Sequence, residues 1–557
     1  MRGFATARLL ADPVTQADLP FLLALWSDSR VARTLGGPRD AEQAGRVLGA
    51  AVRHWHDHGF GRWILRCDGS AVGTVKLARC HVLAATIPVG GSPLAAAAGG
   101  VWGTAREIPG IAALNTKGDA VLFDVSCGAA GSCSAGGFYE DSAGFHAFVV
   151  SQEHGTWGKA QPVPGLSALD KRDGSEVDTV SCAAAGSCSA GGDYIDSAGF
   201  AQAFVVDEVH GTWRRAQRVH GVAALASGGI SSFDSVSCSA AGDCSAAGGY
   251  VDGAGRGQGF VVGEADGIWG TARPVPGLAA LNTGESGGPD ADASIGPSCA
   301  APGDCGASGG YTDSAGHFQG VVADEVHGTW RRVRPVPGLA ALNTGGLAEM
   351  GALSCAAPGD CSAGGFYLAG RDKQGFGVAH AFTMDEVQGT WRRVRPVPGL
   401  AALNTGGSAG ISSMSCAAVG QCSATGFYDD RAGNRQAFVV AERKGTWRRA
   451  QQVPGLAALN KGGDAYISVS CSAAGDWGAA GIYTDGAGRS QPFVVDEVHG
   501  HWHRARQVPG TAALNKGHGA GSADLAALSC APAGSCSAGG SYTDGAGHRQ
   551  VFIVSKR

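Results

Sequence analysis

The chain has 557 residues, which is more than one hydrophobic core usually organises, so several domains or a repeat array are expected. Its 92 glycines follow no Gly-X-Y period, and the apolar content is too high for a disordered chain. The formal net charge of −5 is small for this length and gives no electrostatic reason to expect nucleic acid or an anionic membrane as a partner.

The first 80 residues differ from the rest and predict a small α/β segment. Apolar residues at helical spacing indicate helices over 17–26 and 41–56, followed by strands over 62–66 and 71–78. The N-terminus lacks the apolar run and the small-residue cleavage site of a secretory signal, so the sequence as written predicts a cytoplasmic protein. Residues 81–100, rich in alanine, glycine and proline, are expected to form a linker. Pro88 and Pro93 interrupt the apolar stretch there, so no membrane span is predicted.

Four short strings lie in this first segment: TARLL at 6–10, ADLP at 17–20, WSDSRV at 26–31 and HGFGRW at 58–63. Together they resemble the N-terminal half of the GNAT N-acetyltransferases, of the type that acetylates ribosomal proteins. The resemblance implies an acetyl-CoA site on a later strand, loop and helix, where backbone N–H groups bind the pyrophosphate. It ends near Cys80, before that element. No catalytic or cofactor-binding residue is therefore assigned, and residues 1–80 are expected to be a degenerate acetyltransferase fragment.

From residue 101 to residue 557 the sequence repeats about every 56 residues, eight times. Each copy begins with a tryptophan that is usually preceded by Gly-Thr and followed by basic residues and Val-Pro-Gly. These tryptophans are expected to hold the repeats together by packing: Trp102, Trp157, Trp213, Trp269, Trp330, Trp391, Trp447 and Trp502. A period of this length is typical of a propeller or a solenoid.

Further marks in each copy predict four antiparallel strands. A tyrosine follows the second position of a Cys-x5-Cys pair by six residues, an even spacing that puts Cys133 and Tyr139 on one face of a strand. An Asp-x-Ala-Gly tetrapeptide then predicts a type I turn, and an Ala-Phe-Val-Val run predicts the return strand. Four short strands without room for a crossover helix indicate a propeller blade.

The phase of the copies predicts a closed ring. The first copy begins on the Trp102 strand, and residues 551–554 form the kind of strand that elsewhere precedes a tryptophan strand. The Trp102 strand would therefore complete the last blade and remove the exposed sheet edges. We expect a mainly β protein, with an eight-bladed β-propeller of four-stranded antiparallel blades after the α/β segment.

The tryptophan, double-glycine and Asp-turn signatures resemble bacterial tandem-repeat propellers with kelch-like or sialidase-like blades. The sialidase pattern Ser-x-Asp-x-Gly-x-x-Trp is not met, because Gly211 lies one place too close to Trp213. The resemblance therefore implies the architecture and no glycosidase chemistry.

Seven Cys-x5-Cys pairs flank tight hairpins, where the two Cα atoms can approach the roughly 5.5–6 Å that is typical of a disulfide. The candidate pairs are Cys127 and Cys133, Cys182 and Cys188, Cys238 and Cys244, Cys299 and Cys305, Cys355 and Cys361, Cys416 and Cys422, and Cys530 and Cys536. Disulfides are favoured and would suit an extracytoplasmic protein. Small buried thiols near the crowded centre of the ring are the alternative. Metal ligation is not expected, because two thiolates per blade without a histidine do not complete a tetrahedral site.

Binding specificity is expected where the blades differ. The candidates are the connections over 282–297 and 369–379, the substituted turn at His220, and the pairs Arg331/Arg332, Arg392/Arg393 and Arg448/Arg449. Charge that protects a solvated edge strand explains the arginines without a ligand, and this interpretation is preferred.

Two functions remain open at this point. The preferred hypothesis is a non-enzymatic binding or scaffold module for a protein or glycan ligand, acting through variable inter-strand loops and without a cofactor. The alternative is an acetyl-CoA-dependent N-acetyltransferase whose propeller recognises the substrate.

Overall fold

The computed structural model describes residues 4–5, 10–13, 15–27, 48, 52, 62–67, 70–78 and 81–85, and residues 100–556 except 285–292, 294, 372–376, 474, 517–521 and 532–533. The chain divides into two compact units, Met1–Ala96 and Ala97–Arg557. Among the described residues, no helix is both long and apolar enough to cross a membrane.

The described residues of the first unit include an antiparallel sheet and the helix α1 (Leu19–Ser27). The strands follow chain order, β1 (Phe4–Ala5), β2 (Leu10–Pro13), β3 (Arg62–Cys67), β4 (Ser70–Ala78) and β5 (His81–Ala85). A short 3-10 turn, η1 (Gln16–Asp18), leads into α1. Asp18 accepts hydrogen bonds from the Thr15 backbone N–H and hydroxyl, both at 2.8 Å, and from Arg66 at 2.7 Å. The helix expected over 41–56 falls mainly outside the described residues.

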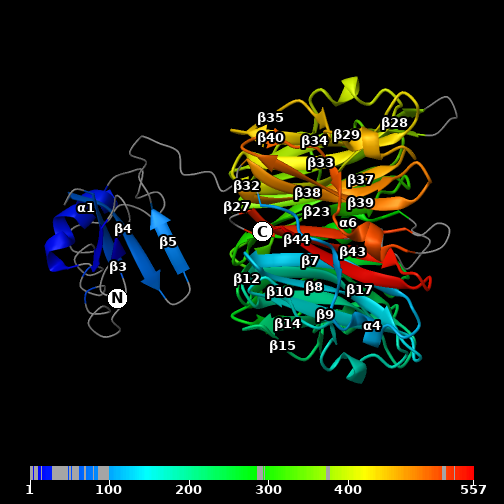
Figure 1. Cartoon of the computed structure of the whole chain (residues 1–557), viewed down its shortest axis with the longest axis horizontal. Coiled ribbons are helices and arrows are strands. Elements are labelled where there is room, and N and C mark those ends of the chain that lie inside the picture. Colours follow the sequence, from blue (N-terminus) through cyan, green and yellow to red (C-terminus); the bar gives the residue numbers. More distant parts are fainter. Residues whose placement is uncertain are drawn as a thin grey trace. The chain divides into compact units, whose positions relative to one another are not determined.

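The second unit is an eight-bladed β-propeller, so the predicted fold class is confirmed. Its blades, numbered 1 to 8 in chain order, follow one another around the ring in colour order from cyan to red (Figure 1). The first strands of neighbouring blades contact one another: β7 (Ala120–Ala129), β12 (Glu176–Ala184), β17 (Ser231–Ala240), β22 (Ile295–Ala301), β27 (Ala348–Ala357), β32 (Ala409–Ala418), β37 (Ala465–Ala473) and β42 (Ala527–Ala531).

Each first strand pairs with a second, antiparallel strand. The second strands are β8 (Ser132–Glu140), β13 (Ser187–Ile195), β18 (Asp243–Val251), β23 (Asp304–Thr312), β28 (Asp360–Arg371), β33 (Gln421–Asp429), β38 (Asp476–Thr484) and β43 (Ser535–Thr543). The third strands are β9 (Phe145–Glu153), β14 (Ala201–Val209), β19 (Gly257–Ala265), β24 (Phe318–Val326), β29 (Gly377–Val387), β34 (Arg435–Arg443), β39 (Ser490–Val498) and β44 (Arg549–Lys556).

The fourth, outer strand of each blade is broken into two short pieces that both pair with the third strand. In blades 1 to 7 these pieces are β10 (Thr156–Trp157) and β11 (Gln161–Pro162), β15 (Thr212–Trp213) and β16 (Gln217–Arg218), β20 (Ile268–Trp269) and β21 (Arg273–Pro274), β25 (Thr329–Trp330) and β26 (Arg334–Pro335), β30 (Thr390–Trp391) and β31 (Arg395–Pro396), β35 (Thr446–Trp447) and β36 (Gln451–Gln452), and β40 (His501–Trp502) and β41 (Arg506–Gln507). Short helical turns follow at α4 (Ile111–Leu114), η2 (Leu166–Ala168), α5 (Val222–Leu225), α6 (Leu278–Leu281), η3 (Leu400–Ala402), α7 (Leu456–Leu459) and α8 (Thr511–Leu514).

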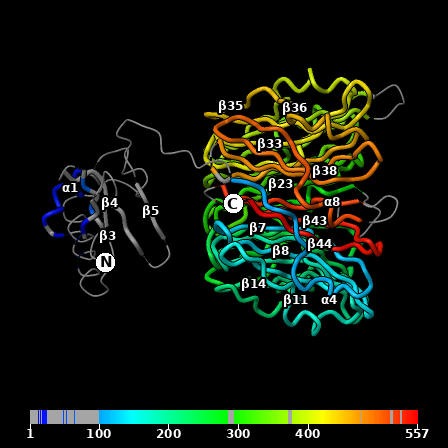
Figure 2. Tube along the Cα trace, viewed as in Figure 1, coloured from blue at the N-terminus to red at the C-terminus, as the bar shows by residue number. Residues whose placement is uncertain are grey.

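The start of the propeller completes its last blade, as the phase of the repeats predicted. Trp102 pairs with Lys556 in an antiparallel bridge, and β6 (Arg106–Glu107) pairs with β44. The Tyr542 hydroxyl donates to the Glu107 carboxylate at 2.6 Å across the same junction. In Figure 2 the red C-terminal strand accordingly runs beside the cyan strands of blade 1.

The second glycine of the double glycine lies against the backbone of the first strand. Next to it, the register between β7 and β8 shifts between Leu122 and Asp124. A Cβ at Gly137 would lie 1.9 Å from the Val121 carbonyl oxygen, so only glycine fits.

Two belts of hydrogen bonds join all eight blades. In the first belt, the backbone N–H of the cysteine in each first strand donates to a serine hydroxyl of the preceding blade at 2.9–3.2 Å. The donors are Cys127, Cys182, Cys238, Cys299, Cys355, Cys416, Cys471 and Cys530. In the second belt, the N–H three places after each tryptophan donates to the carbonyl of the Val-Pro-Gly proline in the preceding blade at 2.7–3.1 Å. His220 replaces that proline in blade 2 and still accepts the bond, from Ala272.

The tryptophans add a third contact between blades. Four indole N–H groups donate to an aspartate of the preceding blade, such as Trp269 to Asp207 at 3.0 Å, and two donate to a serine, such as Trp213 to Ser151 at 2.9 Å. For Trp330, the acceptor position in the preceding blade holds Gly263. The buried Trp330 indole nitrogen has no hydrogen-bond partner. The absence of a side chain at Gly263 explains this orphaned donor.

Replacing Gly263 by serine should therefore stabilise the propeller. A Cβ at Gly263 meets no atom closer than 3.9 Å, so the serine hydroxyl has room to accept from Trp330. We expect the free energy of unfolding to rise by about 1 kcal/mol more for Gly263→Ser than for Gly263→Ala, since both variants lose the flexibility of glycine and only serine supplies an acceptor. Chemical denaturation of the two variants measures this difference. Equal stabilities would contradict it.

Candidate functional site

All seven Cys-x5-Cys pairs form disulfides in the structure. Their Cα atoms lie 3.9–4.0 Å apart, closer than the separation expected from the sequence. The two cysteines are direct cross-strand partners, as Cys182 and Cys188 show, and this brings the two backbones together. In blade 7 Cys471 faces Trp477, whose side chain is 1% exposed. Seven disulfides suit an oxidising compartment.

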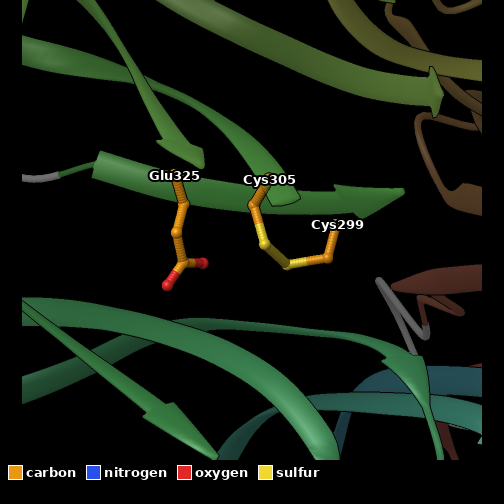
Figure 3. Close-up of side chains that lie close together, drawn as sticks. All are labelled: Cys299, Cys305 and Glu325. Atoms are coloured by element: carbon orange, nitrogen blue, oxygen red, sulfur yellow. A yellow bond between two sulfur atoms is a disulfide. The ribbon is translucent and has the colours of Figure 1, made fainter. Parts of the chain in front are cut away.

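One disulfide lies beside a carboxylate in a way that resembles a metal site. Cys299, Cys305 and Glu325 have side-chain ligand atoms within 4.8 Å of one another, on β22, β23 and β24 (Figure 3). The two sulfur atoms are bonded to each other, so neither is a thiolate that would bind a metal ion. The Glu325 carboxylate instead accepts a hydrogen bond of 2.5 Å from Ser245 of the preceding blade.

Buried carboxyl groups lie at the interfaces between blades, where the third strands end. Glu264, Glu386 and Glu442 occupy the same position in blades 3, 5 and 6 and are each 3–6% exposed. An aspartate of the preceding blade acts electrostatically on each of them: Asp207, Asp324 and Asp385 respectively. In blade 8 the position holds Lys556, which forms an ion pair of 2.9 Å with Asp496.

The interface between blades 4 and 5 differs from its equivalents by one missing side chain. Serines donate to the glutamates at the other two interfaces, Ser189 to Glu264 at 3.3 Å and Ser362 to Glu442 at 3.4 Å. The corresponding residue in blade 4 is Gly306. The Oε1 atom of Glu386 is buried and has no hydrogen-bond partner.

The neighbour of Glu386 is a carboxylate that already has two donors. Asp324 accepts from the Trp391 indole at 2.9 Å and from Arg334 at 2.5 Å. Burial, followed by the charge of Asp324, raises the pKa of Glu386 from 4.5 to about 8. This shift favours the neutral acid form of Glu386, which can donate a hydrogen bond as well as accept one.

A pocket of about 690 Å³ opens at this interface. Apolar atoms make up much of its lining, and charged or titratable side chains also line it: Asp324, Glu325, His327, Arg331, Arg334 and Glu386. Both signs of charge meet there, because Arg334 of the outer strand forms an ion pair with Asp324 of the carboxyl pair. A pocket of this size, with an apolar lining and a few charged side chains, is suited to a small ligand that has both apolar surface and polar groups.

Only part of this site coincides with the residues singled out from the sequence. Arg331 and Arg332 line the pocket, whereas Asp324, Arg334 and Glu386 were not anticipated. A comparison of the repeats with one another would have found the signal, which is the glycine at 306 where most blades have serine. The longer connections over 282–297 and 369–379 fall partly outside the described residues.

The eight tryptophans lie at the blade interfaces. Trp102, Trp213, Trp269, Trp391 and Trp447 are 3–8% exposed, and Trp157, Trp330 and Trp502 are half-buried. The tyrosines of the repeats are buried as well, except Tyr367, which is half-buried. Few of these rings are therefore accessible enough to stack on a ligand.

Comparisons with known proteins leave the family open. No family model and no curated protein matches the sequence. A protein of unknown function from Dyadobacter fermentans is 10% identical with a TM-score of 0.35, covering 83% of this chain and 100% of its own. A Hadza microbial sialidase is 10% identical with a TM-score of 0.35, over 81% of this chain and 74% of its own. A polysaccharide lyase, an ulvan lyase, is 10% identical with a TM-score of 0.37, over 73% and 96%. The GNAT resemblance of residues 1–80 gains no support from these comparisons.

The raised pKa of Glu386 predicts a pH dependence of stability. The folded chain binds more protons than the unfolded chain between the ordinary pKa of 4.5 and about 8, so stability is lost as the pH rises through that window. The melting temperature should therefore fall between about pH 5 and pH 8.5, and less steeply in Glu386→Gln, which mimics the neutral acid. Parallel profiles for Glu386→Gln and the native chain would contradict this. Glu349→Gln, at an exposed carboxylate, should leave the profile unchanged.

Proposed function

We propose that this chain is a non-enzymatic binding module that holds a glycan ligand in the pocket between blades 4 and 5. The proposal keeps the binding role inferred from the sequence and moves the ligand from the variable loops to the inter-blade pocket. The observation that carries it is the pair of carboxyl groups, Glu386 and Asp324, that line this pocket at an interface where Gly306 replaces a serine donor. Carboxyl groups in a partly buried pocket can exchange hydrogen bonds with ligand hydroxyl groups.

A carbohydrate suits the chemistry of the lining. Sugars present hydroxyl groups that both donate and accept, and the neutral acid Glu386 and the carboxylate Asp324 offer both kinds of partner side by side. Arg331 and Arg334 add donors that hold hydroxyl or carboxylate oxygens. The seven disulfides place the protein, in this proposal, in an oxidising compartment outside the cytosol, where glycans are exposed.

A binding role is preferred to a catalytic one because Asp324 already accepts hydrogen bonds from Trp391 and Arg334, which makes it a weak nucleophile or base. The acetyltransferase alternative depends on residues 1–80 alone, and nothing in the pocket favours it.

An array of immobilised oligosaccharides, probed with the whole chain, tests the proposal. We expect the native chain to retain at least one carbohydrate and Glu386→Leu to bind it at least about tenfold more weakly, because leucine removes both the donor and the acceptor at this contact. Glu442→Leu is the matched control, since this equally buried glutamate has a serine partner and lies outside the pocket, and it should bind like the native chain.

Two outcomes would overturn the proposal. The first is that the native chain retains no carbohydrate, and the second is that Glu386→Leu and Glu442→Leu bind equally well. Acetyl-CoA titrated into the same preparation separates the alternative function, because micromolar binding would favour an acetyltransferase.

A further inference from the structure

A band of arginines lies on the outer edge of four consecutive blades. Blades 4 to 7 carry ten of them, on or beside the broken fourth strand, and all ten are exposed: Arg331, Arg332, Arg334, Arg392, Arg393, Arg395, Arg448, Arg449, Arg504 and Arg506. We call this set the arginine edge. It belongs to a chain whose overall formal charge is −5. Blade 2 also has three exposed arginines at these positions, Arg214, Arg215 and Arg218, and blade 3, which has no arginine pair, separates them from the arginine edge.

Most of this charge is not neutralised within the protein. Among the described residues, the ion pairs of the arginine edge are those of Arg334 with Asp324 at 2.5 Å and of Arg506 with Asp496 at 3.7 Å. The other eight guanidinium groups have no ion-pair partner in the part of the chain that the structure describes. Unpaired arginines in a row repel one another, so an external anion would relieve this repulsion.

The fold itself does not require these arginines. Blades 3 and 8 have Gly-Thr where blades 4, 5 and 6 have Arg-Arg, and the backbone is the same. The Gly270 N–H donates to the Gly263 carbonyl at 2.8 Å, and the Arg331 N–H donates to the Asp324 carbonyl at 2.8 Å. Protection of an edge strand also fails to explain the arginines, because blades 3 and 8 have the same edge without them.

The second arginine of each pair has a packing contact that threonine can replace. Arg332 lies over Gly277 of the preceding blade, and Thr271 lies over Gly221 in the same way. The charge at this position is therefore separable from the packing.

The arginine edge is continuous from blade to blade. The N–H groups of Val394, Ala450 and Ala505 donate to proline carbonyls of the preceding blade at 2.7–3.1 Å, so each basic segment adjoins the one before it. A single small anion would occupy one segment, whereas a chain with regularly spaced charges would contact all four.

We propose that the arginine edge of blades 4 to 7 binds a linear polysaccharide that carries sulfate or carboxylate groups. Guanidinium groups bind such oxyanions through paired N–H donors. The disulfides favour a polysaccharide over nucleic acid, because disulfides persist outside the compartments where nucleic acid is held. This surface goes beyond the pocket between blades 4 and 5, and its test leaves that pocket intact.

Heparin, a sulfated polysaccharide, is the probe, titrated into the whole chain. The test variant is Arg392→Gly/Arg393→Thr/Arg448→Gly/Arg449→Thr, which gives blades 5 and 6 the residues of blades 3 and 8. Its Kd should rise by about tenfold or more at low salt, and binding by the native chain should weaken steeply from about 50 to about 300 mM salt because the contacts are electrostatic.

The matched control is Arg214→Gly/Arg215→Thr in blade 2, which is flanked by blades without arginine pairs, and its Kd should change by less than about twofold. The milder variant Arg392→Gln/Arg448→Gln keeps the packing contacts and should weaken binding by about threefold or more. The proposal is overturned if the blade 5 and 6 variants bind heparin like the native chain, if uncharged dextran binds equally well, or if double-stranded DNA binds more tightly than heparin.

Discussion

The structure depends on the pairing of its two ends. A sheet-based ring has no stable edge until the first strand of the propeller joins the last blade, and here Trp102 and β6 pair with β44 to do so. The belt of cysteine N–H to serine hydroxyl bonds passes through the same junction, because Cys127 donates to Ser529, 402 residues away. Once this junction is closed, each blade has a neighbour on both sides, and all eight interfaces make the same backbone contacts. The junction therefore gives the first and last blades the same kind of neighbours and contacts as the other six.

Because the backbone contacts repeat, one blade can lack a side chain that other blades have and still keep its hydrogen bonds to the neighbouring blades. Gly263 removes an acceptor from Trp330, and Trp477 takes the place of a disulfide partner, yet both blades keep the belts. The same tolerance permits Gly306, which leaves Glu386 without a serine donor at the interface where the pocket lies. The proposed pocket rests on one such departure from the repeat, and the repeat supplies the frame around it.

Much of the fold could be predicted from the sequence because its signals are local. The spacing of Cys133 and Tyr139 indicates a strand, the repeated tryptophans give the number of blades, and the phase of the copies predicts that the ring closes at Trp102. The approach of the paired cysteines was misjudged, since a hairpin in direct register brings their Cα atoms to about 4 Å.

The candidate site could not be predicted in the same way. Asp324 and Glu386 come from different blades, and whether their side chains meet depends on how one sheet is placed against the next. Alternation along a strand says which face a residue occupies and does not say what lies opposite on the neighbouring sheet. The acetyltransferase resemblance of residues 1–80 likewise rests on short sequence strings. It ends before the element that would bind acetyl-CoA, so it predicts no site residues that the structure could test.

Hydrogen exchange at the eight cysteine-position amides tests the closed ring most directly. Seven of these N–H groups bond to the blade just before them in the chain, and Cys127 bonds to the last blade. The account predicts that the Cys127 amide exchanges as slowly as the other seven. Fast exchange at Cys127 alone, with the other seven protected, would show an open array and contradict it.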